Sequence, residues 1–115
     1  MAENKLADMS TEFAIQLLKL TDDIKGHYSL SNQLERSGTS IGANIREAKY
    51  AHSRPDFITK LQIALKEASE TGYWLELLYR TKYIDEQTFK NLSSKCTSLR
   101  AMLIASCRTA KENAK

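Results

Sequence analysis

Apolar residues recur at intervals of three and four along almost the whole chain, which is the spacing of one face of an α-helix. Four such series run from about residue 4 to 25, 30 to 52, 54 to 80 and 85 to the C-terminal region. Only four glycines and one proline occur among the 115 residues, so few positions force a helix to end. Four helices of about 20 to 28 residues with short connections predict one all-α domain over residues 1–115, folded as an antiparallel up-down-up-down four-helix bundle.

The predicted connections carry helix-capping residues. Gly26 is expected to end the first helix, and the serines of the following GHYSLS segment can cap the second. Ser53 and Asp56 have the spacing of a capping box at the start of the third helix. Asp85 is the expected N-cap of the fourth helix, whose apolar seam then alternates four- and three-residue steps through Cys96, Leu103 and Ser106.

The second predicted helix carries polar and small residues on both sides of its apolar stripe. One flank is a polar stripe within about 80° of arc on a helix, and it consists of Ser37, Ser40, Asn44 and Glu47. We expect these four to be buried, hydrogen-bonded residues that fix the register of neighbouring helices. On the other flank, Gly38 and Gly42 lack a side chain, so a second backbone can come close there.

The third predicted helix is apolar on two sides. Besides its core stripe, Ile63, Trp74 and Leu77 form a second strip more than about 90° away around the helix, with Glu70 in its middle. One bundle core cannot cover both strips. We therefore predict an interface between copies of the chain formed by Gly38, Gly42, Ile63, Glu70, Trp74 and Leu77.

Glu70 has two possible environments in this prediction. It can pair with a basic residue such as Arg36 or Arg46 across the interface, or it can be a solvated carboxylate.

The net charge of +3 is modest, and the C-terminal quarter is the basic part of the chain. Such a charge can simply keep a protein soluble, or it can attract the phosphates of RNA or DNA. No aromatic residues alternate with the cations as in a single-strand binding platform. The candidate nucleic-acid-binding residues are Arg36, Arg46, Lys49, Arg54, Lys95, Arg100, Arg108 and Lys111.

The sequence offers little for catalysis or metal binding. A di-iron bundle needs Glu-x-x-His on two helices, and neither His27 nor His52 has a Glu three residues before it. Cys96 and Cys107 lie about 16 Å apart along one helix, too far for a disulfide. Arg46 and His52 have the spacing of an R-x(4–6)-H motif found in helical-bundle ribonucleases, which is a remote alternative. We otherwise expect no catalytic residue, metal, cofactor or small-molecule substrate.

The N-terminal residues MAENKLADMS lack a basic region followed by an apolar run, and no segment reaches the roughly 18 apolar residues of a membrane span. These patterns predict a cytoplasmic protein with no membrane partner.

The motif RS-x-x-SI-x-ANI-x-E, which begins at Arg36, and the later Trp74-Leu75-Glu76-Leu77 resemble the four-helix bundle family of proteins encoded in intervening sequences of 23S rRNA genes. The resemblance covers nearly the whole chain. It implies a left-handed bundle, a ring of five subunits and a distant likeness to the accessory variability determinant of diversity-generating retroelements, a basic pentameric barrel that binds nucleic acid and a reverse transcriptase. Family members commonly have Gly where this chain has Ala48, a change expected to lengthen the helix slightly and to leave the fold intact.

Together these observations predict a non-catalytic, homo-oligomeric helical bundle, with a pentamer implied by the resemblance, that acts as an RNA-associated accessory or scaffold protein. The main alternative is a protein-binding adaptor without a nucleic-acid role, in which the open end of the bundle takes a partner helix.

Overall fold

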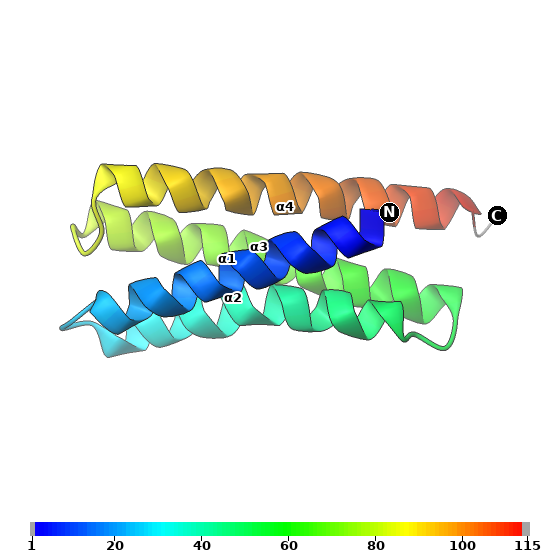
Figure 1. Cartoon of the computed structure of the whole chain (residues 1–115), viewed down its shortest axis with the longest axis horizontal. Coiled ribbons are helices and arrows are strands. Elements are labelled where there is room, and N and C mark those ends of the chain that lie inside the picture. Colours follow the sequence, from blue (N-terminus) through cyan, green and yellow to red (C-terminus); the bar gives the residue numbers. More distant parts are fainter. Residues whose placement is uncertain (1, 114–115) are drawn as a thin grey trace.

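The computed structural model describes the backbone of residues 2–113 and the side chains of residues 5–113. It contains four helices, α1 (Ala2–Asp23), α2 (Tyr28–Lys49), α3 (Arg54–Arg80) and α4 (Glu86–Asn113), and no strand within the described part. Successive helices run in opposite directions along a rod of 48 × 21 × 19 Å (Figure 1). The all-α four-helix fold predicted from the sequence is confirmed.

Two helix starts follow the predicted capping chemistry. The Ser53 hydroxyl oxygen accepts the Asp56 backbone N–H at 3.2 Å at the start of α3. At the start of α4 the Asp85 carboxylate accepts the Thr88 N–H at 2.7 Å, and this hydrogen bond lowers the pKa of Asp85. Each bond satisfies a backbone donor that has no partner inside its helix.

The start of α2 differs from the prediction. The helix begins at Tyr28, ahead of the serines expected to cap it, and its N-cap residue His27 forms no side-chain capping bond. The His27 carbonyl accepts the Ser31 N–H at 3.1 Å, and the His27 ring packs edge-on against Tyr83 at 5.6 Å between ring centroids. The start of α2 therefore has no serine cap, while Gly26, with φ of +103°, turns the chain after α1 as predicted.

The core consists of the apolar stripes expected from the periodicity. Its largest fully buried apolar side chains are Leu6, Phe13, Leu17, Leu34, Ile41, Leu75, Leu78, Leu99 and Leu103. The seam of α4 differs at its C-terminal part, where Cys107 is buried and Ser106 is half-buried. Four- and three-residue steps average 3.5 residues, so over several turns of a 3.6-residue helix the buried side moves to the next position.

The four helices do not contact one another equally. The α2–α3 contact is the most extensive of the bundle and the α1–α4 contact is the smallest. Figure 1 shows α1 crossing the bundle, from beside α2 at its C-terminal end toward α4 at the end where α1 begins, and Met9 and Met102 are partly buried against the core. The bundle is therefore tightest between α2 and α3 and most open between α1 and α4.

The two glycines of α2 serve the contact with α1 of the same chain, which corrects their assignment to an interface between copies. A Cβ atom on Gly38 would overlap Cδ1 of the fully buried Leu17. A Cβ atom on Gly42 would lie 3.2 Å from the Ser10 hydroxyl oxygen. The missing side chains let α1 approach α2 closely, and Gly38 is buried in this contact.

Because of this packing, replacing glycine by alanine is expected to change the stability of the protein differently at two helical positions. A Cβ atom on Gly72 would lie 4.0 Å from the nearest atom, Sγ of Cys96. Gly72→Ala is therefore expected to stabilise the helix by up to about 1 kcal/mol. We expect Gly38→Ala to be less stable than Gly72→Ala by about 1–3 kcal/mol, because the fully buried Leu17 side chain must move to make room for the added methyl group. Urea denaturation followed by circular dichroism measures both, and equal midpoints would contradict the close α1–α2 contact.

Candidate nucleic-acid interface and outer surface of the bundle

The polar stripe of α2 faces α3, but only its first member is fully buried. Ser37 donates to the Leu34 carbonyl at 3.3 Å, and its oxygen lies 2.9 Å from the Thr71 hydroxyl of α3. Thr71 is completely buried and also lies 2.8 Å from the Glu67 carbonyl. Thr71 is not among the residues predicted from the sequence, although its spacing from Ala68 and Leu75 places it on the core stripe.

The remaining members of the stripe correct the expectation of four buried residues. Ser40 and Asn44 are half-buried and donate to carbonyls of α2 itself, at 2.7 and 2.9 Å. Glu47 is exposed and accepts from Lys60 of α3 at 3.3 Å. Because Ser40 and Asn44 fold back onto their own helix and are small, α3 can lie close to α2 along this line.

The second apolar strip of α3 is partly open, and we call Ile63, Glu70, Trp74 and Leu77 the outer α3 face. Ile63 is 37% exposed, whereas Trp74 and Leu77 are half-buried. Trp74 packs against the core, and its ring nitrogen Nε1 is buried without a hydrogen-bond partner among the described residues. The neighbouring Tyr73 is 54% exposed.

Glu70 pairs within its own chain. The Arg36 guanidinium lies 3.0 Å from Glu70 and 3.5 Å from Glu67, joining α2 to α3. The expected basic partner Arg36 is thus found on the preceding helix, α2, and the pair forms within one chain. The two neighbouring carboxylates compensate the positive charge of Arg36, so its attraction for a phosphate is weakened.

Five of the eight predicted nucleic-acid-binding residues gather at one end of the rod. Arg46 and Lys49 are in the last turn of α2, and Arg54 begins α3. The last turns of α4 reach the same end and bring Arg108 and Lys111 (Figure 1). All five are exposed, and none forms an ion pair with another described residue. We call these five residues the cationic end.

The two halves of the rod also differ in their total charge. Residues 2–12, 39–66 and 100–113, which make up this half of the rod, contain nine Lys and Arg against six Asp and Glu. Residues 13–38 and 67–99 contain seven against eight. The positive excess of the chain therefore lies in the half that carries the cationic end.

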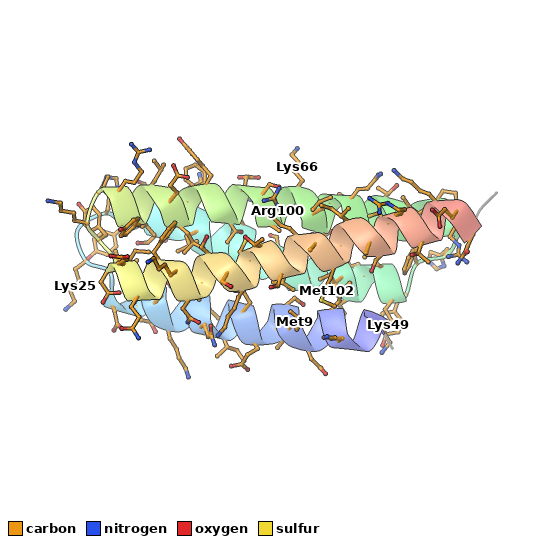
Figure 2. All side chains as sticks on the ribbon, turned by 90° about the horizontal axis from the view of Figure 1, so that it is seen from above. Met9, Lys25, Lys49, Lys66, Arg100 and Met102 are labelled. Carbon is orange, nitrogen blue, oxygen red and sulfur yellow. The ribbon has the colours of Figure 1, made fainter. Side chains whose placement is uncertain are left out.

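The other predicted cations lie elsewhere. Lys95 donates to Gln16 of α1 at 2.9 Å, across the α1–α4 seam. Arg100 is exposed near the middle of the rod, between Lys49 at one end and Lys25 at the other (Figure 2). Together with Arg36, these residues do not belong to the cationic end.

The described residues give limited support for a metal site or for the ribonuclease alternative. No group of three or more His, Cys, Asp or Glu side chains in residues 5–113 could hold a metal ion. α2 ends at Lys49, so the break that Arg46 and His52 would need to meet at one phosphate exists, but no hydrogen bond or ion pair links or orients the two side chains in the described structure. None of the described helices is long and apolar enough to cross a membrane.

The fold and this distribution of charge define an antiparallel four-helix protein with one cationic end. The chain belongs to the 23S rRNA-intervening sequence protein family, whose model matches residues 2–105. It is similar to a Bacteroides thetaiotaomicron VPI-5482 protein described as having unknown function and belonging to the S23 ribosomal protein family. The two chains are 47% identical with a TM-score of 0.89, and the match covers 94% of this chain and 99% of the other. No curated protein matches this chain.

The two cysteines are buried and unpaired. Cys96 donates to the Ala68 carbonyl at 3.1 Å, and burial raises the pKa of the Cys96 thiol to about 11. Burial also raises the pKa of Cys107. Since the thiolate is the reactive form, these residues act as small apolar core side chains at neutral pH.

This environment gives a pH dependence that thiol titration can test. In a Cys107→Ser variant, we expect Cys96 to react with Ellman's reagent at pH 8 at least about 100-fold more slowly than in urea, because at this pH only about 0.1% of a thiol with so high a pKa is ionised. The rate in the folded protein should rise as the pH approaches 11. Reaction at the unfolded rate at pH 8 would contradict the buried position of Cys96.

Proposed function

We propose that this protein is a non-catalytic, self-associating helical bundle that binds RNA through its cationic end and works as an accessory or scaffold protein. The observation that carries the proposal is the gathering of Arg46, Lys49, Arg54, Arg108 and Lys111 from three helices without acidic partners among the described residues. Cations that are not already paired can replace the counterions of a phosphate backbone.

Self-association would strengthen this interaction. One chain carries a net charge of only +3, which is weak for nucleic-acid binding on its own. When several copies are held together, each additional phosphate contact becomes intramolecular, so the affinity of the assembly exceeds that of one chain. A pentamer, as the family resemblance implies, would present five cationic ends.

The outer α3 face is the surface that we assign to self-association. Ile63 and Tyr73 are exposed large apolar residues of α3, and Trp74 and Leu77 are half-buried on the same helix. Clustered apolar residues on one helix face commonly mark a contact with another protein surface. The Arg36–Glu70 pair, already closed within the chain, can lie within such an interface without leaving an unpaired charge.

A protein-binding adaptor is the second candidate. The observation in its favour is that the α1–α4 contact is the least extensive of the bundle, with Met9 and Met102 only half-buried. A partner helix could pack against α1 and α4 there by its apolar face. An absence of any shift of labelled structured RNA or DNA at low salt would favour the adaptor over the RNA-binding protein.

RNA binding can be tested by neutralising part of the cationic end. We expect the double variant Arg54→Gln/Arg108→Gln to bind structured RNA at least about tenfold more weakly at 50 mM salt and to lower the slope of log K against log salt by about 1.4–1.8, since each lost phosphate contact removes about 0.7–0.9. Fluorescence anisotropy with labelled RNA over a salt series measures both quantities.

The matched control for this experiment is Lys19→Gln/Lys25→Gln, which removes the same charge from exposed residues of the opposite half. Its affinity should stay within about twofold of the parent protein, apart from long-range effects that salt screens. An equal loss in both double variants would show that only total charge matters, and no loss in either would contradict the assigned interface.

Self-association can be tested by placing a charge on the outer α3 face. We expect Ile63→Glu to reduce the molar mass measured by light scattering, because a buried unpaired carboxylate destabilises an interface by several kcal/mol, on the order of 3–5. Ile15→Glu is the control, since Ile15 on α1 is 40% exposed compared with 37% for Ile63, and it should leave the mass unchanged. An unchanged mass for both Ile63→Glu and Trp74→Glu would contradict the assignment.

A further inference from the structure

A partly enclosed cavity lies inside the end of the rod that carries the cations. It has a volume of about 260 Å³ and lies among α1, α2 and α3, with one residue of α4 in its lining. Its apolar walls are formed by Leu6, Ile45, Ala48, Phe57 and Leu61. We call it the end cavity.

The end cavity exists because the residues around it are small. Ala7, Gly42, Ala48 and Ser106 line it from three helices. A side chain at position 42 would be crowded, because a Cβ atom on Gly42 would lie 3.2 Å from the Ser10 hydroxyl oxygen. The close α1–α2 contact therefore requires a glycine at a position that also leaves space inside the bundle.

The mouth of the cavity is polar and positive. Arg46 and Lys49, exposed in the last turn of α2, line it together with exposed Thr11. Neither cation forms an ion pair with a described residue, and Lys49 lies 5.9 Å above the centre of the Tyr50 ring. The nearest carboxylate in sequence, Glu47, is bound to Lys60 of α3.

Two full positive charges outweigh the partial negative charge of a helix C-terminus, which is about half of one elementary charge. The mouth thus attracts an anionic group, while the interior favours an apolar one. The combination of an apolar cavity with a few charged groups at its opening is typical of a small-molecule binding site.

We propose that the end cavity binds a small amphipathic carboxylate, with its hydrocarbon part among the apolar walls and its carboxylate between Arg46 and Lys49. The size of the cavity sets the ligand. An apolar cavity of about 150 Å³ holds benzene, so the end cavity has room for an unbranched chain of about eight carbons. Such a ligand is not predictable from the sequence, because the residues that line the cavity are spread from Leu6 to Ser106.

Isothermal titration calorimetry with octanoate tests the proposal. We expect saturation at one octanoate per chain. Butanoate, which lacks four methylene groups, should bind roughly a hundredfold more weakly, since each methylene buried contributes to affinity. Octanol, which keeps the chain but not the charge, should bind at least about tenfold more weakly.

Two kinds of variant locate the site. Ser106→Leu fills the cavity from a half-buried position and should abolish octanoate binding, whereas Ser98→Leu on the exposed side of the same helix should leave it unchanged. Arg46→Gln should weaken octanoate binding by about tenfold, and Arg100→Gln, outside the cavity lining, should not weaken it. Circular dichroism checks that each variant is folded.

Several results would overturn the proposal. They are an absence of saturable binding of octanoate, equal binding of octanol, or binding that survives Ser106→Leu. If octanoate does not bind and Ser106→Leu alters the molar mass instead, a second copy of the chain occupies the cavity and the proposal is wrong. The RNA experiment uses Arg54 and Arg108, which do not line the cavity, so the two proposals fail independently.

Discussion

The close packing of α2 against α3 is the contact on which the other features of this protein depend. The buried hydroxyl groups of Ser37 and Thr71 meet at 2.9 Å, and Ser40 and Asn44 bind their own helix rather than separating the two. Two antiparallel helices held this closely fix where α2 ends relative to where α3 begins. The connection of residues 50–53 keeps Lys49 close to Arg54, and the packing of α2 on α3 holds the two helices antiparallel beyond it.

Much of the fold could be predicted because it depends on local chemistry and periodicity. Ser53 and Asp85 cap their helices as their sequence positions indicate, and the buried leucines fall on the expected stripes. The errors have one physical origin: a helical wheel gives the face of a residue but not the neighbour that covers it. Gly38 faces α1, not a second chain. The predicted serine cap is not found, because α2 begins at Tyr28, ahead of the serines.

The candidate site was predictable as a set of residues but not as an arrangement. All eight cations are visible in the sequence, yet Arg36 is neutralised by Glu67 and Glu70 from another helix, and Lys95 binds Gln16. Only the antiparallel order of the helices shows that the ends of α2 and α4 meet the start of α3. The end cavity was not predictable, because it exists only where small residues of several helices happen to face the same space.

The uneven distribution of charge along the rod gives the molecule a direction in an electric field. A neutral rod 48 Å long would approach a polyanion in random orientations, and most collisions would present the wrong surface. With its excess of cations in one half, this rod experiences a torque that turns the positive half toward the polyanion before contact, over distances of about one Debye length, 8 Å at physiological salt. For the proposed binding to RNA, such orientation before collision would raise the fraction of encounters that present the cationic end.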